Sequence, residues 1–209
     1  MPDSLGVRDL AQTAERRQLT VMFCDLVGST ALSAELDPED LQELLAAFQR
    51  ACAEAIESLG GYVAKEMGDG VMAYFGYPRA REDAAERAIR AGLKAVESIR
   101  AIPHPDAEPL SARVGIATGL VVVGDLSGVG AGARAEVVGK TPNLAARLQA
   151  AAQPGRVVVS RLTHRLAEGV FEFGAHGFEA EDYVGGGHGG GDGVPAECGE
   201  ELEGEEVDV

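Results

Sequence analysis

Two aspartates stand where carboxylates could hold a metal ion. Asp25 lies inside the apolar run 19–27, where an unpaired buried carboxylate is costly, and Asp69 lies between two glycines. Two carboxylates brought together repel unless a divalent cation neutralises them, and Mg²⁺ is commonly held by such oxygens together with substrate phosphates. The simpler alternative is that Asp25 caps the turn at 28–30 and Asp69 only forms its own turn.

A second cluster follows at residues 136–147. Gly139-Lys140-Thr141 invites a P-loop interpretation, but Arg134 occupies the position of the first required glycine, so this stays a weak alternative. Asn143 and Arg147 are four residues apart and share one face of a predicted helix. An amide beside a guanidinium suits ribose and phosphate contacts, and the alternative is a solvated helix face with a salt bridge.

Lys65 is the third candidate. The chain has three lysines against fifteen arginines, and this one stands in a predicted strand between Ala64 and Glu66. The alternative is an ordinary exposed position on a strand.

The first half of the chain predicts the elements that position these residues. Asp37 and Pro38 are typical of a helix start, and Gly60-Gly61 of its end. Gly68-Asp69-Gly70 predicts a hairpin turn. The predicted elements are a strand at 19–27, a helix from 38, strands at 62–67 and 71–75, and a helix at 82–102.

The second half predicts a hairpin around Gly119 and a helix capped by Thr141, with Pro142 at its first position. The predicted elements are strands at 112–118 and 120–125, a strand near 137–138, a helix at 141–152, a strand at 156–160, a helix at 162–167 and a strand at 170–173. Hairpin-paired strands with helices between them indicate an α+β fold with helices on one face of the sheet.

Charge and composition limit the function classes. The chain has 209 residues, 34 acidic against 18 basic, and a net charge of −16. Residues 175–209 hold eleven of the acids and no Lys or Arg, which leaves residues 1–174 near −5. We expect no nucleic-acid partner and no membrane partner, since both need clustered basic residues. The Gly- and Glu-rich stretch 175–209 predicts a disordered tail.

The cysteines Cys24, Cys52 and Cys198 form neither a metal-ligand pattern nor an obvious disulfide framework. The first residues lack the apolar core of a signal peptide, and no apolar run reaches the length of a membrane span. We therefore expect a cytoplasmic protein.

Four motifs together resemble the class III nucleotidyl cyclase catalytic domain, in the family's order and spacing. They are residues 23–30 (FCDLVGST), 65–70 (KEMGDG), 113–119 (RVGIATG) and 138–147 (VGKTPNLAAR). The resemblance covers about residues 17–174 and is nearest to bacterial adenylate cyclases and the soluble adenylyl cyclase branch. It implies a ferredoxin-like, palm-type mixed sheet, a short lead-in at 1–16 and a catalytic domain at 17–174.

The resemblance also implies a role for each matching residue. Asp25 and Asp69 match the two metal-binding aspartates, which hold two divalent ions (Mg²⁺ or Mn²⁺). Lys65 matches an adenine-selecting lysine, and Glu136 stands at its partner position. Asn143 matches a ribose-orienting asparagine and Arg147 an arginine that stabilises transition-state charge. The triphosphate would lie against Arg113 and against the backbone of Leu26, Val27, Gly28, Ser29 and Thr30.

The implied reaction converts ATP to 3′,5′-cyclic AMP and pyrophosphate by in-line attack of the ribose 3′-hydroxyl, for intracellular signalling. The implied assembly is a homodimer whose active sites lie at the subunit interface. One departure favours an alternative, a weak or inactive nucleotide-binding dimerisation module: the family's usual lysine after the last strands is missing at 174–179. A guanylate cyclase is a further alternative, which Lys65 disfavours.

Overall fold

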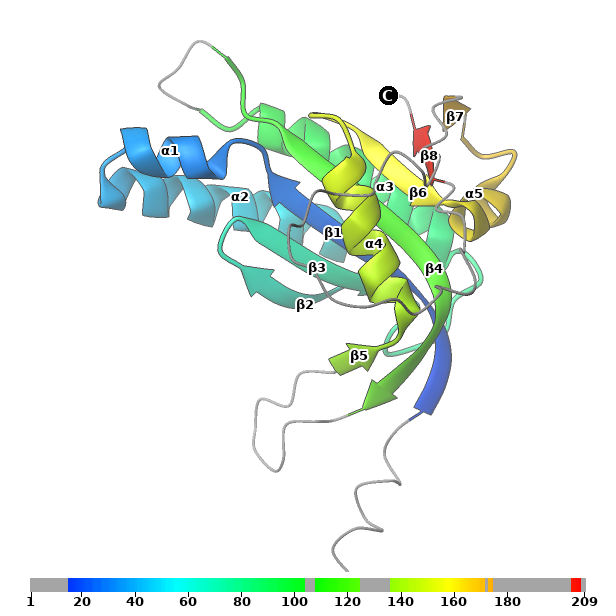
Figure 1. Cartoon of the computed structure of the whole chain (residues 1–209). Helices are drawn as coiled ribbons and strands as arrows, with labels where there is room; N and C mark the ends of the chain where they lie inside the picture. The colour runs from blue at the N-terminus through cyan, green and yellow to red at the C-terminus, as the bar shows by residue number, and fades with distance from the viewer. Residues whose placement is uncertain (1–14, 104–107, 125–135, 172, 175–203, 208–209) are drawn as a thin grey trace, which may run out of the picture.

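A computed structural model describes residues 15–103, 108–124, 136–171, 173–174 and 204–207. Its strands form one mixed sheet in the order β2-β3-β1-β4-β6-β8-β7, with β5 paired to the end of β4 (Figure 1). The strands are β1 (Glu15–Leu26), β2 (Tyr62–Met67), β3 (Gly70–Phe75), β4 (Ala112–Gly124), β5 (Glu136–Val138), β6 (Val157–Ser160), β7 (Phe173–Gly174) and β8 (Gly204–Val207). The helices are α1 (Ser29–Glu35), α2 (Pro38–Ser58), α3 (Ala84–Arg100), α4 (Lys140–Ala151) and α5 (Arg161–Ala167).

The strand β1 lies at the centre of the sheet, antiparallel to β3 on one side and to β4 on the other. Its apolar run is buried, as the sequence predicts for a strand covered on both faces. The predicted hairpin at Asp69 is confirmed as β2 and β3, and α2 begins at Pro38 with Asp37 as its N-cap residue. The first half of the chain is therefore built largely as its local sequence signals indicate.

The strand β4 differs from what the sequence predicts for the second half of the chain. The predicted hairpin around Gly119 is wrong, because β4 runs without a break and Gly119 pairs with Leu19. A Cβ atom at Gly119 would lie 2.5 Å from the hydroxyl oxygen of Thr141. The glycine thus marks a close approach of α4 to the sheet and not a turn.

The two faces of the sheet are covered by different helices. In Figure 1, α4 lies on one face of the sheet and α2 and α3 lie on the other. Met22 and Cys24 pack with α2 and α3, whereas Leu19 and Val21 pack in a second cluster with α4. The α+β class with a mixed sheet is confirmed. One detail changes, since α4 lies on the face opposite to α2 and α3 and the helices do not share a single face.

Two buried thiols lie in the core between β1 and α2. The sulfur atoms of Cys24 and Cys52 are 3.7 Å apart, and both cysteines are free. The contact with Cys52 and burial raise the pKa of the Cys24 thiol. The pair therefore packs as small apolar side chains, and Cys198 lies outside the described residues.

The C-terminal part of the sheet differs from the sequence prediction. The strand β6 is parallel to β4, and β8 lies antiparallel between β6 and β7. Residues 204–207 are thus a strand within the predicted disordered tail, and residues 175–203 lie outside the described part. At the other end, β1 begins at Glu15, two residues before the predicted domain boundary.

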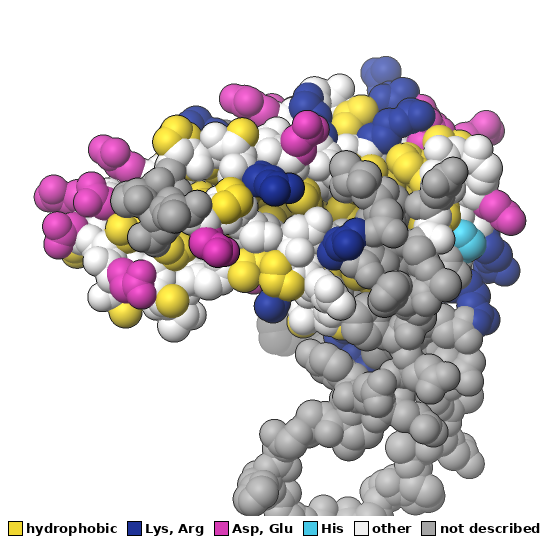
Figure 2. Space-filling model, turned by 90° about the horizontal axis from the view of Figure 1, so that it is seen from above, with side chains coloured by type: hydrophobic (Ala, Val, Ile, Leu, Met, Phe, Trp, Pro, Cys, Tyr) yellow, Lys and Arg dark blue, Asp and Glu magenta, His cyan; other side chains and the backbone are white. Residues whose placement is uncertain are grey.

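Acidic side chains gather at the end of the molecule formed by α1 and the start of α2 (Figure 2). The exposed acids there are Glu35, Asp37, Glu39, Asp40 and Glu43. The charge of the folded part is therefore uneven, even though most of the net charge comes from residues 175–209. Within the described ranges, no helix has both the length and the apolar composition needed to cross a bilayer.

Candidate active site

Asp25 lies one residue before the end of β1, half-buried, with Gly70 of β3 and Arg113 of β4 as its register partners. Strand alternation places it on the same face as Val21, which is the face covered by α4. Burial and then the nearby charge of Asp69 raise the pKa of its carboxyl group, while Arg113 and a hydrogen bond with Gln149 act in the opposite direction. The two predicted aspartates are therefore close enough to repel each other.

Three hydrogen bonds hold Asp69 and the β2–β3 turn in place. Its carbonyl oxygen accepts a hydrogen bond from the backbone N–H of Leu26 (2.9 Å), and its Oδ2 accepts one from the Ser29 hydroxyl (2.5 Å). The Gln49 side chain of α2 donates to the carbonyl oxygen of Gly68 (2.9 Å). These contacts fix the second carboxylate beside the end of β1, where Asp25 stands.

The segment Leu26–Thr30 joins β1 to α1 beside both aspartates. The N–H of Leu26 is bonded to Asp69, and that of Val27 donates to the carbonyl oxygen of Ser111 (2.9 Å). These two amides are therefore occupied within the chain, so the prediction that this segment donates N–H groups to a triphosphate narrows to Gly28–Thr30. Gly28 has a φ of 77°, which suits glycine, and open space where a side chain would stand.

Arg113 faces Asp25 across the β1–β4 ladder. Its charge lowers the pKa of the Asp25 carboxyl, against the larger effect of burial. Among the described residues, nothing accepts a hydrogen bond from its buried Nε atom. A buried donor without a partner is costly, and an anionic ligand oxygen is one group that would satisfy it.

Lys65 reaches the α4 face of the sheet because β2 is irregular. The pairing of β2 with β3 shifts between Val63 and Lys65, and Lys65 then stands opposite Met72. Met72 packs in the cluster under α4, and directly paired residues point to the same face. Without this bulge, alternation would direct Lys65 to the α2 face. Its side chain is exposed.

Glu136, the predicted partner of Lys65, pairs with Gly124 at the start of β5. Its side chain lies outside the described part of the structure. That Glu136 accepts a hydrogen bond from the adenine base contacted by Lys65 therefore stays a prediction. The structure establishes only its place at the end of the β4–β5 pair.

The helix α4 carries Asn143 and Arg147 on its exposed side, four residues apart, as predicted. The helix begins at Lys140, after Gly139, so Thr141 lies inside the first turn and is not the cap. The Thr141 side chain is buried and its hydroxyl donates to the carbonyl oxygen of Leu120 (3.4 Å). A hydroxyl held against the sheet does not suit the P-loop alternative.

Gly115, in the third motif, stands where α4 approaches β4 most closely among the contacts described here. A Cβ atom there would lie 2.2 Å from both the carbonyl oxygen of Ala145 and the backbone nitrogen of Gln149. The helix α4 therefore rests directly on β4, one pleat from the pair formed by Asp25 and Arg113.

The two aspartates suit a hard divalent cation that keeps other oxygen ligands. Within the described ranges there is no group of three or more His, Cys, Asp or Glu side chains that could hold a metal ion. Mg²⁺ commonly binds through one or two carboxylates and completes its shell with water and substrate phosphates. The repulsion that raises the pKa of Asp25 is the kind that a bound cation relieves.

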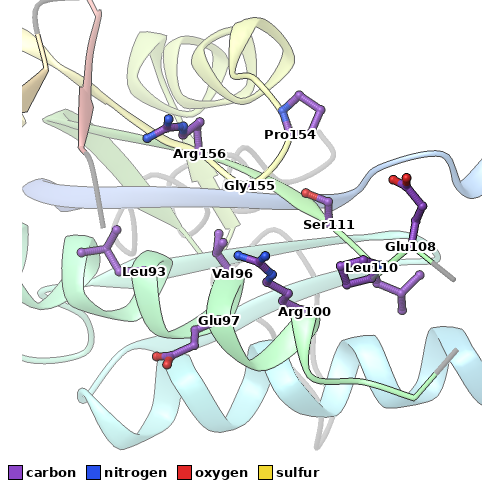
Figure 3. A pocket seen from close by; sticks show the side chains of 11 residues that line it. Leu93, Val96, Glu97, Arg100, Glu108, Leu110, Ser111, Pro154, Gly155 and Arg156 are labelled. Atoms are coloured by element: carbon purple, nitrogen blue, oxygen red, sulfur yellow. The ribbon is translucent and has the colours of Figure 1, made fainter.

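A cavity of about 670 Å³ lies elsewhere, between the end of α3, residues 108–111 and residues 154–156 (Figure 3). Arg100, Leu110 and Ser111 are among its lining residues. It is separate from the aspartates, although the Ser111 carbonyl on its rim holds Val27. The aspartates do not line this cavity, so a triphosphate could not be bound to them inside it.

A family model for the adenylate and guanylate cyclase catalytic domain matches residues 11–184. The chain belongs to this family. The match to the catalytic domain of this family covers most of the part of the chain that the structure describes.

One of the curated relatives is named an adenylate cyclase, and another is an uncharacterised protein. An adenylate cyclase of Streptomyces coelicolor is 34% identical over 143 residues, which are 68% of this chain and 32% of that protein. An uncharacterised protein of Rhizobium meliloti is 44% identical over 161 residues, 76% of this chain and 16% of that protein. This chain thus spans about a third or less of these relatives.

Solved structures share the fold. The guanylyl cyclase Cya2 has a TM-score of 0.77 at 26% identity, covering 93% of both chains. The adenylyl cyclase CyaB from P. aeruginosa has a TM-score of 0.74 at 26% identity, covering 94% of this chain and 96% of that one. Since both kinds of cyclase match about equally well, the fold alone does not select the base.

Sequence reasoning missed three side chains that hold the aspartates: Ser29 as a donor to Asp69, Gln49 at the turn, and Gln149 at Asp25. Ser29 stands in the first motif, so its hydroxyl could have been predicted from the sequence as a hydrogen-bond donor near the aspartates. The two glutamines are far from the aspartates in sequence and belong to no motif. Only the packing of α2 and α4 on opposite faces brings them to the site.

Proposed function

We propose that this domain is an adenylate cyclase that converts ATP to 3′,5′-cyclic AMP and pyrophosphate. The observation that carries the proposal is the pair of close carboxylates, Asp25 and Asp69, in a chain of the cyclase family. Lys65 supports ATP over GTP: its exposed cationic side chain leaves the sheet on the α4 face and can donate, but not accept, a hydrogen bond.

Asp25 and Asp69 are the residues that would hold Mg²⁺ or Mn²⁺. Two bound cations would supply the positive charge that lowers the pKa of the ribose 3′-hydroxyl and neutralises the triphosphate. The backbone at Gly28–Thr30 follows β1 directly, and the buried Nε of Arg113 has no partner among the described residues; in this proposal both groups would contact phosphate oxygens. The 3′-oxygen then bonds to the α-phosphorus while the bond from that phosphorus to the pyrophosphate oxygen breaks.

Arg147 and Asn143 would complete the site of a second copy of the chain. Gln149 lies against Gly115 of the sheet, and Arg147 stands two residues earlier, which is about 200° around a helix. Arg147 is therefore directed away from the Asp25 of its own chain and is exposed. In a homodimer, it would stabilise the charge that develops on the partner's substrate, and Asn143 would orient the ribose.

The direct experiment incubates the purified chain with Mn²⁺ and either ATP or GTP and measures the cyclic nucleotide. We expect cyclic AMP from ATP and little cyclic GMP, with an Asp25→Ala variant inactive. Lys65→Glu should shift the preference toward GTP, since a carboxylate accepts where lysine donates. Release of ADP and phosphate, or equal use of both nucleotides by the unchanged chain, would contradict the proposal.

The shared site is tested by complementation. Asp25→Ala and Arg147→Ala chains should each be inactive alone, and a mixture should regain about a quarter of normal activity, because random pairing forms one intact site in half of the dimers. A mixture as inactive as its components would contradict the interface site. Sedimentation of the unchanged chain as an active monomer would contradict it independently.

A second candidate function has one specific observation behind it. From Gly174 to the end, the sequence has no Lys or Arg, so neither a lysine nor an arginine from this stretch can contact a triphosphate. A nucleotide-binding dimerisation module without turnover would bind a fluorescent ATP analogue and form dimers, but would yield no cyclic nucleotide with either metal ion. We propose a cytoplasmic location for either function, and fractionation of cells expressing the tagged chain tests it.

A further inference from the structure

The turn that carries Asp69 depends on contacts with other elements for its shape. Asp69 stands between Gly68, which has a φ of 67°, and Gly70. Glycines on both sides give the backbone of the turn many accessible conformations. The N–H of Leu26 holds the Asp69 carbonyl oxygen, and Gln49 holds the Gly68 carbonyl oxygen. Both bonds restrict the main chain of the turn, and neither acts on the Asp69 carboxylate itself.

The hydroxyl of Ser29 acts on that carboxylate. It donates a hydrogen bond to Oδ2 of Asp69 at 2.5 Å, and both residues are half-buried. A hydrogen bond to a charged acceptor is stronger than one between neutral groups, so it restricts the rotation of the carboxylate. It leaves both lone pairs of Oδ1 for a ligand. Because the hydroxyl is neutral, it orients the carboxylate without repelling a cation, as a lysine or arginine would.

The Asp25 carboxylate lies against the same turn. A Cβ atom at Gly70 would lie 3.5 Å from Oδ1 of Asp25, and the two residues are register partners in β3 and β1. Gly70 directly follows Asp69, so the geometry itself brings the two carboxylates to neighbouring positions. Mg²⁺ demands near-ideal octahedral geometry, so a cation held by both aspartates depends on the rotation of each carboxylate.

The position of Ser29 is set by the end of β1. The N–H groups of Leu26 and Val27 are bonded to Asp69 and Ser111, which fixes the connection to the β2–β3 turn and to the start of β4. Gly28, with its φ of 77°, then turns the chain into α1, and Ser29 is the first residue of that helix. The hydroxyl therefore approaches Asp69 from a backbone that is held on both sides of the site.

We propose that Ser29 is a positioning residue for Asp69, whose hydroxyl sets the rotation of the carboxylate that would hold a divalent cation together with Asp25. The inference rests on the proposed function. It gives the Ser29 side chain a role that is separate from the contact expected between its backbone N–H and the triphosphate.

The first experiment measures Mn²⁺ binding by electron paramagnetic resonance, with 3′-deoxy-ATP present so that no turnover occurs. Ser29→Ala removes the hydroxyl, and we expect about tenfold weaker Mn²⁺ binding, as for other residues that orient a metal ligand, with an unchanged unfolding midpoint. Ser29→Thr keeps a hydroxyl and should restore the binding. Normal Mn²⁺ binding by Ser29→Ala, or equal losses in the alanine and threonine variants, would overturn the inference.

Ser33→Ala is the matched control on the same helix. The Ser33 hydroxyl donates to the carbonyl oxygen of Thr30 (2.7 Å) and not to an aspartate. This variant loses a serine hydroxyl and its hydrogen bond within α1, so it should bind Mn²⁺ normally. A loss equal to that of Ser29→Ala would show a general effect on α1 and overturn the inference.

The second experiment measures cyclase activity against the Mn²⁺ concentration. Excess cation should compensate for a carboxylate that is less well oriented. Ser29→Ala should therefore need about tenfold more Mn²⁺ for half-maximal activity and should approach the normal kcat at saturation. A lower kcat at every Mn²⁺ concentration, with no shift of the half-maximal point, would overturn the inference.

The two proposals fail in different ways. If the unchanged chain makes no cyclic AMP, the proposed function is wrong, and the Mn²⁺ measurement still tests Ser29. If the unchanged chain makes cyclic AMP and Ser29→Ala binds Mn²⁺ normally, only the role of Ser29 is wrong.

Discussion

The strand β1 contributes side chains to both faces of the sheet, and the two faces differ in the chemistry of those side chains. On the α2/α3 face, Cys24 and its neighbours pack in an apolar core. On the α4 face, the next residue, Asp25, is a half-buried carboxylate with a raised pKa beside a second carboxylate. Both faces therefore contain a buried apolar cluster, and the α4 face also holds carboxylates that are unfavourable until a ligand neutralises them.

The largest expected effect on stability comes from the α2/α3 face. Phe48 of α2 is fully buried, so Phe48→Ala should lower the free energy of unfolding by about 3–5 kcal/mol, measured by urea denaturation. Leu166→Ala, at a residue that is 47% exposed, should change it by less than about 0.5 kcal/mol. A loss below about 1 kcal/mol at Phe48 would show that this face does not carry the stability.

On the α4 face, Arg147→Ala should lower kcat about 100-fold with little change in KM, because the side chain acts on charge that develops in the transition state. The unfolding midpoint should stay the same, since the side chain is exposed. Arg50→Ala, an exposed arginine of α2, is the matched control and should leave kcat unchanged. A rise in KM with unchanged kcat would contradict the role.

Gly115→Ala tests whether α4 must rest on the sheet. The new Cβ would meet backbone atoms of α4 at 2.2 Å, so the helix must shift, and we expect a loss of about 1–3 kcal/mol together with the loss of cyclase activity. Gly124→Ala in the same strand has no atom within 4 Å and should be neutral in both assays. Full activity of Gly115→Ala would contradict the close approach.

The smallest effect on the free energy of unfolding is expected at Asp83, at the start of α3. Hydrogen bonds from Arg87 and Arg81 lower the pKa of Asp83, so its contribution is present above the unfolded-state pKa and is lost as the pH falls through the lower folded-state value. Asp83→Asn keeps a good cap residue and should cost less than about 1 kcal/mol at pH 7 and less still near pH 3. An equal cost at both pH values would exclude the ion pairs as its cause.

Local signals predicted the first half of the fold well. The apolar run of β1, the Asp37-Pro38 start of α2 and the Asp-Gly turn at Asp69 each depend on neighbouring residues, and all three are confirmed. The prediction failed at Gly119, since a glycine that admits a helix and a glycine that forms a turn look the same in sequence. It also missed the pairing of β8 with β6, which joins segments far apart in the chain.

The sequence by itself determined the residue types of the candidate site and, through four ordered motifs, the family. Their residues are close in sequence, so short-range patterns can reveal them. The tertiary structure decided which face each residue serves. A bulge after Val63 turns Lys65 to the α4 face, and α4 rests on Gly115 with Arg147 on its exposed side. Strand irregularity and helix packing depend on contacts between distant segments, which no local pattern records.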